Sequence, residues 1–260
     1  MSRHRFFLES PLPSVEGEIA LPLSASDLHH AAAVLRVRPS EEIDVVEPGG
    51  RVWRVRVEHA SSQAILATIA EEVTLGPDAR HPYVTLVFGV SKGSKNDDIV
   101  EGGTEVGVSE FLPVLTARSI VKLDGERRAE RGERWRRVAL AAAKQSKRES
   151  VPKVSGPGDL ADALVRLAAY DLVLVAWEEA AAVGRGVREA IAAARPLRAG
   201  AYVAVVVGPE GGLTAEEVSA LERVGGVTVT LGVTILRAET AAVVAAALVS
   251  HELGGLGNAS

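Results

Sequence analysis

From Tyr83 onward, short apolar runs alternate with segments of helical periodicity, and this alternation limits the possible folds more than any other feature. Apolar strands separated by helices form a mostly parallel sheet that helices cover on both faces. The expected strands are 83–88, 111–115, 172–176, 202–207 and 227–231. The expected helices are 97–106, 126–146, 160–168, 187–193, 215–224 and 239–253. In an α/β sheet of this kind, ligands bind at the carboxyl ends of the strands.

The first 75 or so residues have a different, β-rich pattern. Residues Arg51–Val57 alternate between polar and apolar side chains, as a strand with one buried face does. Residues Glu42–Val46 form a suitable partner strand, and Pro48–Gly50 form a turn between the two. A small closed β-barrel with one helix fits this pattern.

One helix is expected in this N-terminal region, over residues 28–35. Ser26-Asp27 would cap its start, and it would end near Pro39. Glycine and proline residues at 76–82 mark a linker. We therefore expect one domain at 1–75 and a second at 82–260.

Composition excludes several classes of protein. The chain has no cysteine, which excludes a disulfide framework, a thiolate metal site and a cysteine nucleophile. Residues 1–6 lack the apolar stretch of a signal peptide, and the apolar run 241–249 has about half the length that a membrane span needs. We expect a cytoplasmic protein that uses no metal and contacts no membrane.

Charge is distributed unevenly along the chain. The formal net charge is −5, yet residues 127–148 contain 9 basic and 2 acidic side chains. A local basic patch on an acidic protein suits a specific polyanion site, because the rest of the surface repels nonspecific contacts. A solvated helix face explains the same charges equally well.

Three loops that follow expected strands carry unusual residues. The strand at 202–207 leads into Gly208-Pro209-Glu210-Gly211-Gly212, and Thr214 with Glu217 has the spacing of a helix capping box. Glycines let the backbone turn sharply and let a ligand approach its amides. The run is neither a Walker loop nor a GxGxxG fingerprint, and it also fits a simple tight turn.

The second loop, 231–240, places Ile235 and Leu236 just before a final Ala-rich helix. Either a flat apolar ligand such as adenine covers these side chains, or they belong to the core. Glu239 also fits a first-turn acid that favours the helix dipole. The third loop carries Lys92 and Lys95 beside glycine, which suits phosphate contact, although surface lysines are usually only solvated.

Taken together, the segments KGSKNDDIVEGGTEVGVSEFLPV, AAKQSKRESVP, VVVGPEGGLTAEEV and LGVTILRAETA resemble the RsmE family in sequence and order. Members of that family methylate a uridine of bacterial 16S ribosomal RNA at ring N-3. The RFF at the N-terminus and HHAAAVLRVRPSEEI resemble the PUA-like RNA-binding domain of the family. The resemblance covers nearly the whole chain.

The resemblance implies a SPOUT-type α/β fold, a parallel sheet with a deep trefoil knot, preceded by a PUA-like β-barrel. It implies S-adenosylmethionine as cofactor, a homodimer, and 16S ribosomal RNA as substrate, within the small subunit or an assembly intermediate. The residues that match the cofactor-binding motifs are Trp177, Glu178, Gly208, Pro209, Glu210, Gly211, Gly212, Leu231, Gly232, Ile235, Leu236 and Thr240.

The sequence departs from the family pattern in one helix. Ser94, Asn96 and Asp98 replace an acid, a methionine and an apolar residue of the usual KGDKMDWIV run. Gly102-Gly103 replaces a helix-favouring pair, at a cost of about 1 kcal/mol per glycine in a helix interior. Details of this helix and of RNA contact there are therefore not carried over from the family.

Methylation of uracil at N-3 requires removal of a weakly acidic proton and stabilisation of the resulting anion. Arg237 is the candidate for charge stabilisation, with a structural salt bridge to Glu210 or Glu239 as the alternative. Glu239 or Glu210 with a raised pKa is the candidate base. The candidate RNA-binding residues are Arg3, Arg5, Arg36, Arg38, Lys92, Lys95, Lys144, Lys147 and Arg148.

Other readings stay open at this point. A SPOUT methyltransferase could modify another base or a ribose hydroxyl, and the chain could be a noncatalytic RNA-binding assembly protein. A nucleotide hydrolase is disfavoured because no Lys-Ser/Thr pair follows the glycine loop.

Overall fold

The computed structural model divides the chain into two compact units. The first unit comprises residues 1–75 with 147–151, and the second comprises 76–146 with 152–260. The sequence indicates the change near residue 75, but it does not indicate that 147–151 belongs with the first unit. The structure describes residues 4–13, 17–48, 51–73, 82–119, 121, 123–146, 148, 150–179, 185–194, 196–198 and 200–256. Gly49 and Gly50 of the expected turn at 48–50 and most of the expected linker lie outside these residues.

The first unit is a five-stranded sheet around an apolar core. Its strands are β1 (Arg5–Phe7), β2 (Glu18–Ala20), β3 (Glu42–Val46), β4 (Val52–Ala60) and β5 (Ile65–Val73). They lie in the order β1-β3-β4-β5-β2. The segments that follow the two edge strands, β1 and β2, are hydrogen-bonded to each other. The Glu9 N–H donates to the Pro22 carbonyl at 2.7 Å, so the two edges of the sheet approach each other. Ile43, Val55 and Ile65 are fully buried inside it.

The helix of the first unit differs in detail from the expected one. Helix α1 (Ala25–His29) begins one residue after Ser24, whose side chain accepts a hydrogen bond from the Asp27 N–H. The expected cap at Ser26 is therefore wrong. The helix continues as a π-helical segment η1 (His30–Leu35) and ends at Arg36, which has φ +54°. That left-handed residue stops the helix before Pro39.

The second unit is built on one parallel sheet, which confirms the predicted α/β class. The strands run in the order β11-β13-β10-β12-β6-β7-β8, and β9 also pairs with β7. Every pairing is parallel. The strands are β6 (Tyr83–Gly89), β7 (Glu110–Leu115), β8 (Lys153–Val154), β9 (Gly158–Asp159), β10 (Leu172–Ala176), β11 (Arg185–Gly186), β12 (Tyr202–Val207) and β13 (Gly226–Thr230).

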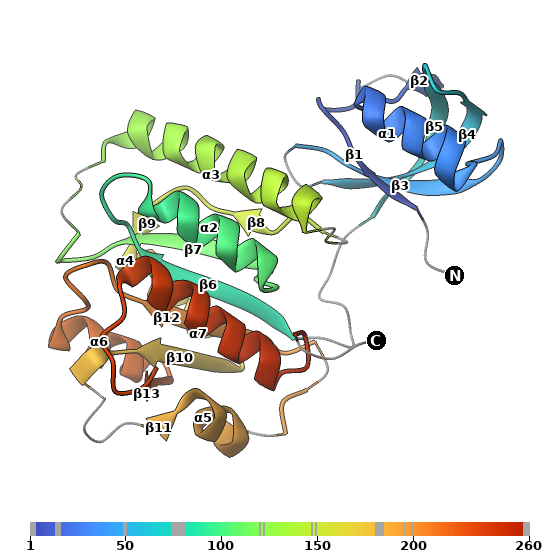
Figure 1. The fold of residues 1–260 in the computed structure, drawn as a ribbon. Helices are drawn as coiled ribbons and strands as arrows, with labels where there is room; N and C mark the ends of the chain where they lie inside the picture. The colour runs from blue at the N-terminus through green and yellow to red at the C-terminus, as the bar shows by residue number, and fades with distance from the viewer. Residues whose placement is uncertain are drawn as a thin grey trace. The chain divides into compact units, whose positions relative to one another are not determined.

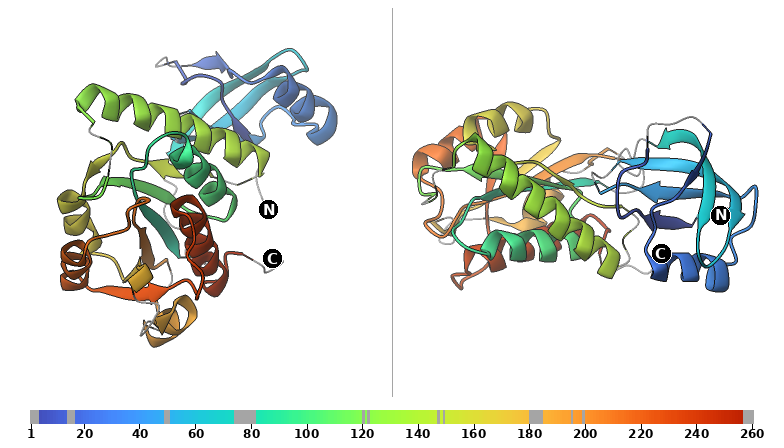
Figure 2. Two further views of the ribbon diagram at one scale, coloured as in Figure 1. Left: turned by 60° about the vertical axis from the view of Figure 1, so that its left-hand side comes forward. Right: turned by 90° about the horizontal axis from the view of Figure 1, so that it is seen from above.

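Helices cover this sheet, as Figures 1 and 2 show. Helices α2, α3 and α7 lie side by side, and α7 packs on β6 and β12. Helices α4 and α6 share a separate apolar cluster, in which Leu167 and Leu221 contact side chains of the sheet. The helices are α2 (Lys95–Glu105), α3 (Gly125–Gln145), α4 (Leu160–Leu167), α5 (Val187–Ala194), α6 (Ala215–Arg223) and α7 (Ala238–Glu252).

Close packing accounts for the two glycines inside α2. A Cβ on Gly102 would lie 2.9 Å from the Val243 side chain of α7, and a Cβ on Gly103 would lie 2.6 Å from the Phe111 ring. The low helix propensity of both glycines is thus accompanied by a closer approach of α2 to its neighbours. Among the described residues, no helix has both the length and the apolar character to cross a membrane.

Candidate cofactor pocket

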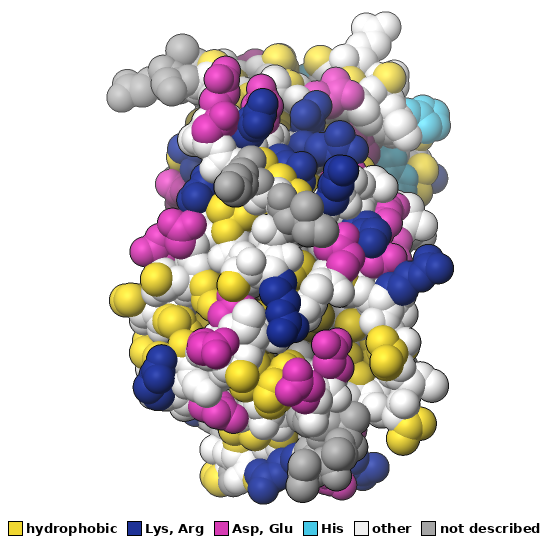
Figure 3. Space-filling view, turned by 90° about the vertical axis from the view of Figure 1, so that its left-hand side faces the viewer, with side chains coloured by type: hydrophobic (Ala, Val, Ile, Leu, Met, Phe, Trp, Pro, Cys, Tyr) yellow, Lys and Arg dark blue, Asp and Glu magenta, His cyan; other side chains and the backbone are white. Residues whose placement is uncertain are grey.

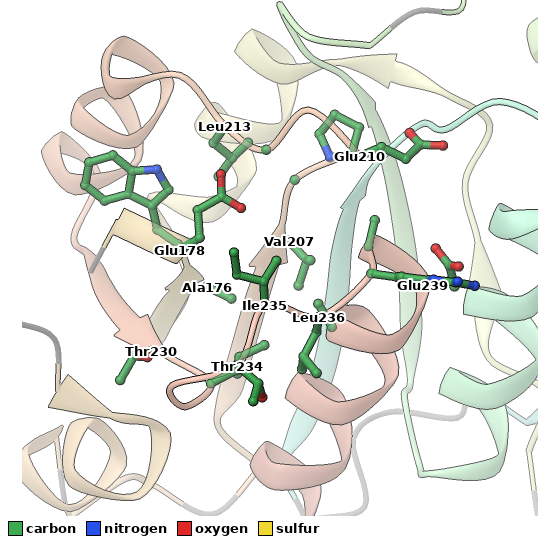
Figure 4. A pocket seen from close by; sticks show the side chains of 18 of the residues that line it. Ala176, Glu178, Val207, Glu210, Leu213, Thr230, Thr234, Ile235, Leu236 and Glu239 are labelled. Carbon is green, nitrogen blue, oxygen red and sulfur yellow. The ribbon is translucent and has the colours of Figure 1, made fainter. Parts of the chain in front are cut away.

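Three loops at the carboxyl ends of adjacent strands enclose a cavity of about 460 Å³. The loops follow β10, β12 and β13, which are neighbours in the sheet. This is the edge at which α/β proteins bind ligands, and the volume lies in the range of small-molecule sites. In Figure 4 the carboxylates of Glu178, Glu210 and Glu239 lie around the edge of the cavity, while Val207 and Ile235 lie near its centre.

The loop after β12, residues 208–213, turns back on itself. A Cβ on Gly208 would lie 2.7 Å from the Gly212 carbonyl carbon, and Gly212 has φ +70°, so both positions require glycine. The Gly212 N–H donates to the Pro209 carbonyl at 2.8 Å. A Cβ on Gly89, at the end of β6, would lie 2.3 Å from the Pro209 ring. The predicted capping box of Thr214 and Glu217 is present.

The loop after β13, residues 231–237, exposes its apolar side chains. Val233 is 99% exposed and Ile235 is 91% exposed. Neither side chain belongs to the core. For Ile235, the explanation that remains from the sequence analysis is coverage by a flat apolar ligand. Leu236 is half-buried and lines the cavity. An exposed apolar loop at the wall of a cavity is typical of a surface that a ligand or partner covers.

The third wall comes from Trp177 and Glu178. The Trp177 N–H donates to the Val229 carbonyl at 3.2 Å, which holds this segment beside β13. The Glu178 Oε1 atom lies 2.9 Å from the point that a Cβ on Gly212 would occupy, so a side chain there would displace the carboxylate. The absence of a side chain at Gly212 leaves the Glu178 carboxylate beside the glycine loop at the cavity.

An ion pair joins the glycine loop to the start of α2. The Lys95 Nζ lies 3.1 Å from Glu210 Oε1, and both residues line the cavity. Burial opposes ionisation of Glu210, but its own backbone N–H and the Lys95 ammonium outweigh burial and hold its pKa below the usual range. A general base needs the opposite shift near neutral pH. The raised pKa considered for Glu210 is therefore wrong.

Arg237 and Glu239 stand at the start of α7. Both line the cavity, and Arg237 is exposed and forms no ion pair within the described part of the chain. Glu210 pairs with Lys95 instead, so the salt bridge considered between Arg237 and Glu210 is not formed. One carboxylate oxygen of Glu239, Oε2, is buried and has no hydrogen-bond partner among the described groups. A buried carboxylate oxygen without a donor favours a ligand that supplies one.

Ten of the twelve predicted cofactor residues line this cavity. Gly211 and Thr240 do not; Gly211 faces Arg118, whose Cβ would lie 3.1 Å from an added Cβ. Sequence reasoning missed several other lining residues. They are Ala176, Val207, Leu213, Thr230, Val233, Thr234, Ala238 and Ala241. Five belong to strands or to the start of α7 and have no motif, whereas Leu213, Val233 and Thr234 lie in the loops that the sequence had already singled out.

The predicted RNA-binding residues are dispersed over both units. Arg5 is partly buried and pairs with Asp44 at 3.4 Å, and Lys95 lines the cavity. Burial lowers the pKa of Arg148 to about 10. Arg3 and Lys147 lie outside the described residues. The exposed candidates are Arg36, Arg38, Lys92 and Lys144.

Comparisons with known families match both units. Residues 79–250 match the RNA methyltransferase domain family, and residues 23–70 match the RNA methyltransferase PUA domain family. These matches agree with the α/β second unit and the β-rich first unit, and they confirm the SPOUT-type and PUA-like classes predicted for the two.

Individual relatives agree over almost the whole chain. Ribosomal RNA small subunit methyltransferase E of Bacillus subtilis (strain 168) is 32% identical over 248 residues, covering 95% of this chain and 96% of the relative. The Mycobacterium bovis protein of the same name is 36% identical over 220 residues, covering 83% and 80%. A crystal structure of the Neisseria gonorrhoeae protein of that name bound to S-adenosyl methionine superposes with TM-score 0.62 at 29% identity, covering 96% of this chain and 98% of that chain. The chain therefore belongs to the RsmE family of RNA methyltransferases.

Proposed function

We propose that this protein methylates ring N-3 of a uridine in 16S ribosomal RNA, with S-adenosylmethionine as the methyl donor. The observation that carries the proposal is the cavity between the loops 208–213 and 231–237, which combines glycine turns, exposed apolar side chains and carboxylates. Supporting it, relatives that match nearly the whole chain are named small-subunit ribosomal RNA methyltransferases, and one was crystallised with S-adenosyl methionine.

The residues of the cavity suit this cofactor. Its charged lining residues are Lys95, Glu178, Glu210, Arg237 and Glu239, which together carry a net charge of −1. A net negative lining favours a ligand that carries a sulfonium and an ammonium group. The unpartnered Oε2 of Glu239 is an acceptor for such an ammonium, and Ile235 offers an apolar face for adenine. When bound, the cofactor supplies an electrophilic methyl group.

The residues of the chain would then orient the uracil and stabilise its charge. The N-3 proton would pass to Glu239, the remaining candidate base, or to solvent, and its loss leaves negative charge on the uracil ring, mainly on the oxygens beside N-3. Arg237 has no ion-pair partner among the described residues, so its guanidinium is available to donate to those oxygens. Lys95 is engaged by Glu210, so we assign it to holding the glycine loop more than to contacting RNA.

RNA would be held through phosphate contacts on both units. The exposed candidates are Arg36, Arg38, Lys92 and Lys144. On the face shown in Figure 3, several Lys and Arg side chains gather in the upper part, with acidic side chains beside them, and apolar side chains are exposed lower down. Arg5 is tied to Asp44 and suits a supporting role in the sheet. Arg3 remains a candidate because it belongs to the N-terminal region, and Lys147 and Arg148 remain candidates because they belong to the basic segment.

We also propose a homodimer acting in the cytoplasm on the small subunit or an assembly intermediate. The exposed apolar side chains Val233 and Ile235 suit coverage by the cofactor, by a second protomer, or by both. Sedimentation at micromolar concentration tests the dimer, and a monomer at all concentrations would exclude it.

The decisive experiment is transfer of a labelled methyl group to ribosomal RNA, followed by mass spectrometry of the nucleosides. The proposal predicts 3-methyluridine at one site in small-subunit RNA and none without the protein. A ribose-methylated nucleoside would show that the substrate atom is different. No methyl transfer together with no S-adenosylmethionine binding by calorimetry would favour the noncatalytic RNA-binding alternative.

A further inference from the structure

The glycine loop at 208–213 needs restraint from outside itself. It contains three glycines, Gly208, Gly211 and Gly212. Glycine loses more conformational entropy than any other residue when its backbone becomes ordered. The one backbone hydrogen bond within it, among the described residues, is the turn from the Gly212 N–H to the Pro209 carbonyl. A turn of this kind does not fix the position of the loop relative to the sheet.

A short turn after β7 supplies that restraint. Residues 116–119 are closed by a 3.0 Å hydrogen bond from the Ser119 N–H to the Thr116 carbonyl and by a 3.1 Å bond from the Thr116 N–H to Ser119 Oγ. From this turn, Arg118 Nη1 donates to the Gly211 carbonyl at 2.8 Å and to the Leu213 carbonyl at 3.2 Å.

Each of these two peptide groups is bonded at both ends. The Gly211–Gly212 peptide accepts from Arg118 and donates through Gly212 N–H to Pro209. The Leu213–Thr214 peptide accepts from Arg118 through the Leu213 carbonyl and donates through the Thr214 N–H to Glu217 Oε2 at 2.9 Å. Fixing both ends of a peptide group fixes its plane, and bonds in such a chain strengthen one another.

Glu217 also accepts a hydrogen bond from the turn that carries Arg118. Its second oxygen, Oε1, accepts from the Ala117 N–H at 2.7 Å, so the residue that caps α6 is also bonded to the turn that carries Arg118. The turn at 116–119 and the loop at 208–214 therefore form one closed hydrogen-bonded ring. Arg118 does not line the cavity, so it acts on a ligand only through the loop.

We propose that Arg118 is a positioning residue that holds the glycine loop in its ligand-binding conformation before the cofactor arrives. The inference deepens the proposed function, because it assumes that this loop binds S-adenosylmethionine. Arg118 is exposed, so its removal leaves the apolar core of the sheet unchanged. The expected loss is therefore local to the loop and to cofactor affinity.

Amide hydrogen exchange of the free protein tests the ring without any ligand. Arg118→Ala should make the Gly212 and Thr214 amides exchange about tenfold faster, while amides of β6 and β12 stay unchanged. Arg118→Lys should recover part of the protection, because an ammonium can still reach one carbonyl. Arg223→Ala, an exposed arginine at the far end of α6, is the matched control and should change neither amide.

Calorimetry and steady-state kinetics then test the link to the cofactor. Arg118→Ala should raise the Kd and KM for S-adenosylmethionine about tenfold and leave kcat at saturating cofactor within about twofold. A general structural role would instead lower Tm and speed exchange throughout the sheet. If Arg118→Ala does not fold, Glu217→Gln replaces it in the exchange experiment. The glutamine side chain cannot accept from both the Ala117 and the Thr214 N–H, so one of these two amides should exchange faster.

Unchanged exchange at Gly212 and Thr214 in a folded Arg118→Ala variant would overturn the inference. So would faster exchange with a cofactor Kd within twofold of the parent. Failure of the unsubstituted protein to bind S-adenosylmethionine would count against the proposed function instead, and the exchange result would still decide whether the ring exists.

Discussion

Two of the three loops that enclose the cavity, 208–213 and 231–237, differ in how they are held. Residues 208–214 are tied by hydrogen bonds to the turn at 116–119 and by an ion pair to Lys95. Within the described part of the chain, residues 233–236 form no hydrogen bond, and the preceding Gly232 is hydrogen-bonded to the Thr230 side chain. The first loop is held by polar contacts, whereas the second presents Val233 and Ile235 to solvent.

The difference indicates two roles in ligand binding. A loop that is already ordered contributes affinity because little entropy remains to be lost when the ligand binds. When a ligand covers exposed apolar side chains of a loop, the burial of their surface favours binding. A loop without hydrogen bonds to the rest of the protein can also close over the ligand. We infer that the glycine loop is a fixed wall and that residues 231–237 close over the cofactor.

The largest effect should come from Arg237, in the closing loop. Arg237→Ala should lower the single-turnover methylation rate by roughly 10²- to 10³-fold, because a donor to the developing anion is lost. Arg237→Lys should recover part of the rate, since a point charge cannot reproduce the planar guanidinium. Affinity for S-adenosylmethionine should change little. A normal rate at saturation with lost cofactor binding would assign Arg237 to the pocket wall.

A smaller effect should follow from disturbing the fixed wall itself. Gly208→Ala places a Cβ 2.7 Å from the Gly212 carbonyl carbon, so the loop must shift. We expect a Kd for S-adenosylmethionine roughly 30-fold higher by calorimetry, which corresponds to about 2 kcal/mol of strain. Gly158→Ala in β9, where nothing lies within 4 Å of the added Cβ, is the control. Equal affinities of the two variants would show that this backbone does not form the site.

The closing loop should be sensitive to the loss of apolar surface. Ile235→Ala should raise the Kd for S-adenosylmethionine about tenfold, because side-chain area covered by the ligand is lost. Tm should not change, since Ile235 is 91% exposed. Val165→Ala on α4, with 79% exposure and no contact with the cavity, is the control for both measurements. An unaltered Kd would mean that Ile235 faces something other than the cofactor.

The smallest effect concerns the ion pair between Lys95 and Glu210. The pKa of Glu210 is lowered in the folded protein, so its carboxylate is ionised at neutral pH. The ion pair with Lys95 is lost only as pH falls through that lowered pKa. Cofactor affinity should therefore be steady from pH 8 to pH 5, and Glu210→Gln should raise Kd by about threefold at neutral pH. A titration of wild-type affinity with a midpoint near pH 6 to 7 that Glu210→Gln abolishes would contradict the lowered pKa.

The sequence predicted the elements of the second unit well because their apolar runs are long. Strands Leu172–Ala176 and Tyr202–Val207 have the predicted bounds, and the other predicted strands and helices differ by no more than two residues at either end. The two- and three-residue strands were missed, since so short a segment has no measurable period. In the first unit the nine-residue strand Ile65–Val73 was not predicted either. The π-helical turn at His30–Leu35 was also missed, because no residue preference distinguishes it from an α-helix.

The candidate site was predicted in part for a related reason. Loops such as Gly208–Gly212 carry unusual residues in one continuous segment and can be found from sequence. The contact of Arg118 with Gly211 joins residues 93 positions apart, and Thr116–Ser119 has no distinctive motif, so only the fold brings it to the loop. The pairing of Lys95 with Glu210 was missed likewise, and it changed the role assigned to Lys95.

Hydrogen exchange with and without S-adenosylmethionine shows whether the cofactor binds between a fixed loop and a closing loop. We expect strong new protection at residues 231–237 and little change at Gly212 and Thr214, which are already hydrogen-bonded in the free protein. Saturating S-adenosylmethionine that leaves the exchange of 231–237 unchanged, or that protects a different part of the chain, would contradict it.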